Sequence, residues 1–185
     1  MQLVDLKNNA KDEFIRKMRK LIYKKKIENN FMDIVFLCIG TDRIIGDSFG
    51  PIVGSNLKNK LERYNICNIN VYGTLEDNVS YTNINKVENI IYNRHPKSCV
   101  IAIDSALSDK ENIGKIYASE GKLVLGKGLN KRRIEIGDIS IKGVVGKNYK
   151  IPQYNFSMLQ NISLNEVIKL ANLVTDGLLE VIKYT

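Results

Sequence analysis

The stretch of residues 33–54 constrains the fold more than any other part of the chain. It opens with consecutive apolar residues from Ile34 to Ile39, which predict a buried strand. A glycine-rich loop follows, and Gly50-Pro51 then marks the start of a helix, where proline costs no hydrogen bond. A strand, a tight loop and a helix in this order place polar groups at the carboxyl edge of a parallel sheet, where such folds bind ligands.

A second apolar strand is predicted from Ser98 to Ile103, and it stops on Asp104. The spacing of apolar residues predicts helices between the strands, one directly after Pro51 and one over residues 80–94. Sequential parallel strands require such crossovers. We therefore expect an α/β fold of three layers, in which a mostly parallel open sheet carries helices on both faces.

The same patterns predict the remaining elements. A helix is expected over residues 7–27, a short strand over 69–73, and a C-terminal helix that Ser163 caps. Residues 113–146 predict short strands with glycine-rich connections. Two of these helices, the one after the first strand and the C-terminal one, are expected to face the protein core with Ile52, Val53, Leu57, Leu61, Tyr64, Val167, Ile168, Ala171, Val174, Leu178 and Ile182.

Length and composition favour a single domain over residues 1–185. The chain is 44% apolar and 26% charged, and its apolar runs fall far short of the roughly 18–20 residues of a membrane span. The charged first 30 residues argue against a signal peptide, so we expect a soluble intracellular protein. The three cysteines show no CxxC spacing, which favours buried reduced thiols over a zinc site or disulfides.

The net charge of +8 is concentrated near the N-terminus. Residues 1–30 hold nine lysines and arginines against four acids, which accounts for +5. One interpretation is a surface for nucleic acid or an acidic partner. The alternative is a helical extension that packs through Phe14, Met18, Leu21 and Ile22 and exposes its charges to solvent. The rest of the chain carries only +3, so we expect no nucleic-acid partner.

Asp47 and Asp104 are the candidate catalytic residues. Asp47 precedes the helix that begins at Pro51, whose dipole favours the ionised carboxylate. Asp104 ends an apolar strand, where partial burial raises the pKa of a carboxyl group. Each residue alone also fits a structural role, as a helix cap or a turn residue. Together, however, they emerge at the same edge of a parallel sheet, and two such acids can share a proton, one activating water and the other protonating a leaving group.

Other chemistries fit the first loop less well. Its glycine spacing matches neither a P-loop nor a dinucleotide-binding fingerprint, and Asp47 stands where the P-loop lysine belongs. Metal binding by Asp42, Asp47, Glu76 and Asp104 remains a rival. The only histidine, His95, is expected at an exposed helix end near the opposite edge of the sheet, which argues against its being a ligand or part of a Ser/His/Asp triad.

A basic loop is expected after the strand around Val124. Residues 126–133 combine two glycines with four cations, so they form either a segment that grips an acidic or peptide substrate or a solvated turn. The candidate substrate-binding residues in this loop and around the aspartates are Asp42, Ser48, Glu76, Ser105, Lys127, Asn130 and Lys131.

Four blocks of the sequence resemble the YyaC family of sporulation proteins. The blocks are Gly-Thr-Asp-Arg-Ile-Ile-Gly-Asp-Ser-Phe-Gly-Pro (40–51), Tyr-Gly-Thr-Leu-Glu-Asp-Asn-Val (72–79), Ala-Ile-Asp-Ser-Ala-Leu (102–107) and Gly-Lys-Gly-Leu-Asn-Lys (126–131). The resemblance covers about residues 33–183 and leaves the basic N-terminal helix outside. That family is similar in fold to the germination protease of endospore-forming bacteria and, more distantly, to hydrogenase maturation proteases.

This resemblance implies roles for the two aspartates. In the germination protease two aspartates form an aspartic-type pair, and the segments that hold them match those around Asp47 and Asp104. Phe49 stands in place of the leucine in the first segment, and Ser105 is inserted in the second. The chain is much shorter than the germination protease, and the histidine with which hydrogenase maturation proteases bind nickel has no match here.

The sequence thus predicts a sporulation-associated peptidase that hydrolyses peptide bonds with an aspartate pair and uses no cofactor or metal. The alternatives are a non-catalytic peptide-binding or assembly protein of sporulation, and a metal-dependent hydrolase. The expected partner is a peptide or protein substrate, such as a spore protein. No association with a membrane is expected. The expected location is the cytoplasm, with the forespore and spore core included.

Overall fold

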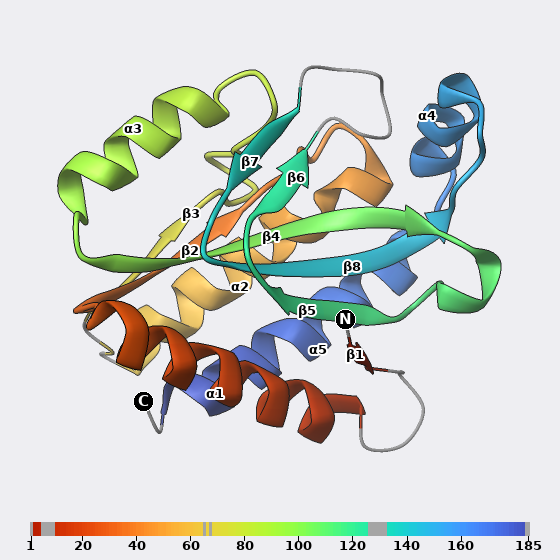
Figure 1. The fold of residues 1–185 in the computed structure, drawn as a ribbon. Helices are drawn as coiled ribbons and strands as arrows, with labels where there is room; N and C mark the ends of the chain where they lie inside the picture. The colour runs from red at the N-terminus through yellow and green to blue at the C-terminus, as the bar shows by residue number, and fades with distance from the viewer. Residues whose placement is uncertain (1, 5–9, 65, 67, 126–132, 184–185) are drawn as a thin grey trace.

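The structure is a computed structural model that describes residues 2–4, 10–64, 66, 68–125 and 133–183. Six strands form one sheet in the order β1-β5-β8-β4-β2-β3 (Figure 1). The strands are β1 (Gln2–Val4), β2 (Asp33–Cys38), β3 (Ile69–Tyr72), β4 (Ser98–Ser108), β5 (Ile116–Glu120) and β8 (Ile139–Lys147). The four strands from β8 to β3 run parallel, and β5 and β1 are antiparallel to their neighbours. The expected mostly parallel α/β sheet is therefore confirmed.

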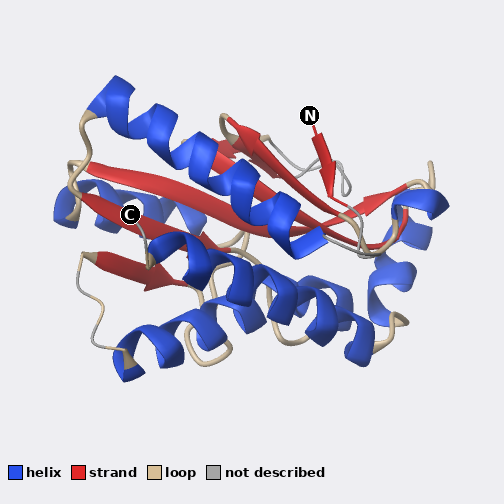
Figure 2. Cartoon of the chain, turned by 90° about the horizontal axis from the view of Figure 1, so that it is seen from below, coloured by secondary structure: helices blue, strands red, loops and turns tan. Residues whose placement is uncertain are grey.

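Helices cover both faces of the sheet, as expected (Figures 1 and 2). One face carries three helices, with α5 contacting both of the others. These helices are α1 (Ala10–Asn29), α2 (Phe49–Arg63) and α5 (Leu164–Ile182). The second face carries α3 (Ile84–Arg94) and a hairpin of β6 (Leu123–Leu125) and β7 (Ile134–Ile136). Each face thus has its own hydrophobic core, which explains why the central strands are apolar along both sides.

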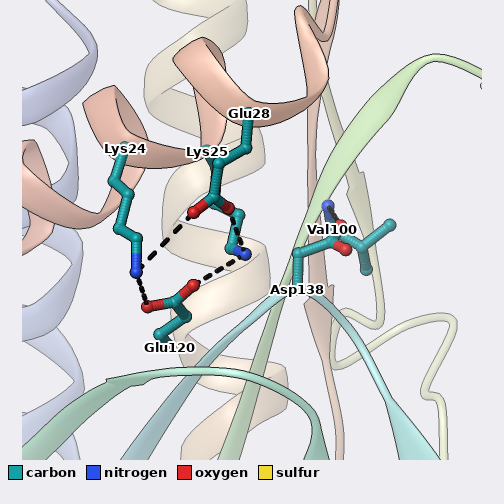
Figure 3. A network of polar contacts seen from close by, with 6 residues as sticks. All are labelled: Lys24, Lys25, Glu28, Val100, Glu120 and Asp138. Atoms are coloured by element: carbon teal, nitrogen blue, oxygen red, sulfur yellow. Dashed lines mark hydrogen bonds and ion pairs between the residues drawn. The ribbon is translucent and has the colours of Figure 1, made fainter.

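The basic helix α1 is an integral part of the first core. Phe14 and Met18 are fully buried, and Leu21 and Ile22 are buried beside them, as their helical spacing predicts. On its polar side, Lys24 and Lys25 form ion pairs with Glu120 at the end of β5, at 2.6 and 2.8 Å (Figure 3). The Lys24 pair is exposed and adds little stability, and the Lys25 pair is only partly buried. Apolar packing therefore holds the helix on the sheet.

Several local expectations need correction. Tyr64 and Ile168 are exposed, because Tyr64 follows the end of α2 and Ile168 lies near the start of α5. The short helices η1 (Ile45–Ser48), η2 (Lys110–Asn112) and α4 (Pro152–Gln160), and the strands β1 and β7, had no clear local signal. Ser163 does precede α5, but its side chain makes no capping hydrogen bond; its carbonyl oxygen instead accepts from Glu166 N–H at 3.1 Å.

The cysteines agree with the expectation of buried thiols. Cys38 and Cys99 are free and buried, and burial raises the pKa of Cys99 to about 12. Cys67 lies outside the described residues.

Among the helices in the described residues, none combines the length and apolarity that crossing a membrane requires.

Candidate functional site

The loop after β2 folds back tightly against the end of its own strand. Thr41 N–H donates to the carbonyl oxygen of Asp47 at 3.1 Å, and Gly40 N–H donates to Val79 at 2.7 Å. Gly40 has φ +142°, and a Cβ at this position would lie 2.0 Å from the Asp47 carbonyl oxygen. Glycine is therefore required for the loop to hold Asp47 at the carboxyl end of β2.

The start of α2 fixes the other side of Asp47. A Cβ on Gly50 would lie 2.1 Å from the Ile39 carbonyl oxygen, so the helix backbone is in close contact with the end of the first strand. Phe49 is fully buried, and its ring packs directly on Gly143 of β8. The segment that contains Asp47 thus packs both against the end of β2, through Gly50, and against β8, through Phe49.

Asp104 lies inside β4, and the expectation that the strand stops at this residue was wrong. The ladder between β2 and β4 ends at the pair Cys38–Ile103, but β4 stays paired with β8 as far as Ser108. This pairing supplies the backbone hydrogen bonds that a turn would otherwise have provided. Asp104 is consequently the first residue of β4 beyond the end of its neighbour β2, beside the loop that carries Asp47.

The environment of Asp104 favours its protonated form. Burial raises its pKa well above the ordinary range of an aspartate, and the nearby Asp47 carboxylate raises it further. Two groups act in the opposite direction: Ser105 N–H, which donates to Asp104 Oδ1 at 2.8 Å, and the ammonium of Lys142. The structure therefore brings the two predicted aspartates into one electrostatic environment and gives Asp104 a strong affinity for a proton.

Lys142 is the charged neighbour that sequence reasoning missed. It faces Asp104 directly across the ladder between β4 and β8. The only available signal was a lysine within the apolar run of residues 139–145, and this does not reveal which residue of another strand lies opposite.

The predicted substrate-binding residues differ in their surroundings. Asp42 and Glu76 are exposed. Ser48 is buried, and its hydroxyl donates to the Ile45 carbonyl oxygen at 2.6 Å without capping α2. Ser105 is partly buried and contributes its backbone N–H to Asp104. The other three, Lys127, Asn130 and Lys131, lie outside the described residues.

His95 lies far from the aspartates. It follows α3 and precedes β4, where its carbonyl oxygen accepts from Ser98 N–H at 3.1 Å. Asp104 is six residues further along the strand than Ser98, about 20 Å at the usual rise per residue. The expectation of an exposed ring was wrong, because His95 is half-buried and its Nε2 lies 3.0 Å from the Tyr72 hydroxyl. Within the described part of the chain, no three His, Cys, Asp or Glu residues are arranged to hold a metal ion.

A large groove lies away from this site. It has a volume of about 1130 Å³ and is lined by one side of α1, by Ile34 and Ile69 near the amino ends of their strands, and by the end of α5. The aspartates are at the opposite, carboxyl edge of the sheet.

Comparisons with known proteins bear on the family and the fold. The chain matches the family described as "Protein of unknown function (DUF1256)" over residues 5–177, a range that includes α1. It is 38% identical over 145 residues to "Uncharacterized protein YyaC" of Bacillus subtilis (strain 168), which covers 78% of this chain and 67% of that protein. A solved structure of a NiFe hydrogenase maturation protease, HycI from Thermococcus kodakarensis KOD1, has a similar fold. Its TM-score is 0.50 at 16% identity, over 84% of this chain and 98% of that one.

Proposed function

Since the chain belongs to the DUF1256 family and is a relative of YyaC, we propose that it is a peptidase in which Asp47 and Asp104 hydrolyse a peptide bond. The observation that carries this proposal is the position of both aspartates at the carboxyl edge of the sheet, where burial and the nearby Asp47 carboxylate raise the pKa of Asp104. The protease fold of the structural neighbour supports a peptide or protein substrate. A spore protein as that substrate, and a location in the cytoplasm, forespore or spore core, rest on the resemblance to sporulation proteins.

The unequal environments assign a role to each aspartate. In this mechanism Asp104, whose pKa is raised by burial and by the nearby Asp47 carboxylate, holds the single proton of the pair, and Asp47 acts as its ionised partner. The Asp47 carboxylate then takes a proton from water while the water oxygen bonds to the carbonyl carbon of the substrate. The C–N bond breaks as Asp104 gives its proton to the leaving nitrogen. The proton now on Asp47 passes to Asp104, which restores the pair.

The test compares the wild-type protein with Asp47→Asn and Asp104→Asn. Each is incubated with an extract of sporulating cells, and newly formed peptide termini are identified by mass spectrometry. We expect termini that form with the wild type and with neither variant. Both variants keep the backbone hydrogen bonds that hold Asp47 in its loop, and an asparagine oxygen can still accept from Ser105 N–H.

The same experiment separates the alternatives. Cleavage by either variant at the wild-type rate would reject the aspartate pair. A protein that retains a peptide from the extract without cutting it is a binding or assembly protein. Loss of cleavage on chelation identifies a metal-dependent hydrolase, whereas the proposed pair tolerates a chelator.

A further inference from the structure

Lys142 and Asp104 project from the same face of the sheet. They are register partners on adjacent parallel strands, and their preceding residues, Ile141 and Ile103, are both buried in the core under α1, α2 and α5. Because side chains alternate along a strand, both charged residues point to the other face. The positive charge of Lys142 lowers the pKa of the Asp104 carboxyl group, against the larger effects of burial and of Asp47.

The ammonium of Lys142 has no fixed partner within the described part of the chain. No ion pair within 4.0 Å and no hydrogen bond connects it to another described residue, although the side chain is partly buried. Lys25, which is also partly buried, contacts Glu28 and Glu120 at 2.8 Å each. Lys60 contacts Asp176 at 2.6 Å. A lysine that faces a carboxyl group without a close ion pair keeps its N–H donors available for a ligand.

We propose that Lys142 is a third catalytic residue, whose ammonium binds the carbonyl oxygen of the scissile peptide bond. This inference rests on the proposed hydrolysis. As water oxygen bonds to the carbonyl carbon, the electron pair of the C=O double bond moves onto the carbonyl oxygen, and a cation beside that oxygen stabilises the negative charge. When the C–N bond breaks, the pair returns to form the new carboxyl group, and Lys142 neither gains nor loses a proton.

The test uses Lys142→Met, which keeps the length of the side chain without its charge, and Lys142→Arg, which keeps the charge. Lys147→Met, in the same strand but exposed and stacked over Tyr149, is the matched control. On a peptide that the wild type cleaves, we expect Lys142→Met to lower kcat about 100- to 1000-fold with a smaller change in KM. Lys142→Arg should recover part of this loss, and Lys147→Met should cleave at the wild-type rate.

A second measurement needs no substrate. Carbon-13 NMR of the aspartate carboxyl groups follows the titration of Asp104 in each protein. Removing a neighbouring cation disfavours the ionised carboxylate, so the pKa of Asp104 should rise in Lys142→Met and change less in Lys142→Arg. A role confined to packing would leave this titration unchanged.

Two results would overturn the inference. One is wild-type cleavage by Lys142→Met while Asp104→Asn is inactive, and the other is an unchanged Asp104 titration in Lys142→Met. If the wild-type protein cleaves nothing, the proposed hydrolysis fails, and the titration alone decides whether Lys142 belongs to this site.

Discussion

Asp104 is an acidic residue at the end of the most deeply buried part of β4. It follows Ile101, Ala102 and Ile103, which are fully buried, and its own carboxyl group is partly removed from water. A carboxyl group in such a position keeps its proton unless cations or hydrogen bonds compensate. Here one N–H bond and one lysine lower the pKa of Asp104 only in part, because burial and then the nearby Asp47 carboxylate raise it by more.

The influence of Asp47 on Asp104 can be measured directly. In Asp47→Asn the neighbouring negative charge is absent, so the pKa of Asp104 should fall toward the ordinary range, opposite in sign to the change in Lys142→Met. Carbon-13 NMR titration of the carboxyl group measures the shift. Asp42→Asn, in the same loop but exposed, is the control, and an equal shift in that variant would show that the effect is not specific to Asp47.

At the scale of elements, close backbone contacts position the segment that carries Asp47. The Gly50 Cα lies so near the Ile39 carbonyl oxygen that a methyl group has no space, and neither backbone can move without shifting its strand or helix. The position of the candidate site thus depends on the packing of α2 against β2.

Gly50→Ala should lower the free energy of unfolding by about 1–3 kcal/mol, because overpacking forces the backbone to shift. Denaturant unfolding measures the change. Lys58→Ala, at an exposed position of the same helix, should stay within about 0.5 kcal/mol. A Gly50→Ala protein as stable as the wild type would show that the contact is not tight.

The role of α1 in the fold can be tested in the same way. Phe14 is fully buried, so Phe14→Ala should cost about 3–5 kcal/mol of unfolding free energy. Tyr23 lies on the same helix and is 69% exposed, so Tyr23→Ala should cost far less. Equal effects would contradict the finding that the helix packs through one apolar face.

At the scale of the whole molecule, Asp104 links stability to pH. Its pKa is higher in the folded than in the unfolded protein, so between about pH 4, the usual pKa of an aspartate, and the folded pKa the native state binds more protons. The stabilisation from protonated Asp104 is fully present below this window and is lost as the pH rises through it.

The expected result is a pH-dependent difference between the wild type and Asp104→Asn. The thermal midpoint of the variant, relative to that of the wild type, should rise from about pH 4 toward neutral pH. The wild type loses the stabilisation from protonated Asp104 over this range, whereas an asparagine does not titrate. Differential scanning calorimetry over that range measures it. A constant difference would mean that Asp104 has an ordinary pKa in the folded protein.

The sequence by itself determined the elements whose signals are local. The apolar run of residues 34–39 and the helical spacing of Phe14 and Met18 predicted β2 and the packed face of α1, because side-chain periodicity reports burial directly. Gly40 and Gly50 marked the loop, and the carboxyl ends of parallel strands placed Asp47 and Asp104 at one edge. The motifs in that region also identified the family.

Only the tertiary structure decided how distant segments meet. That β4 continues past Asp104, and that Lys142 lies opposite it, depends on pairing with a strand more than 30 residues away in the sequence. The exposure of Tyr64 and Ile168 likewise depends on where α2 ends and α5 begins. Strand order and register result from the packing of the whole sheet, and the affinity of a carboxyl group for a proton depends on the charges that this packing brings near it.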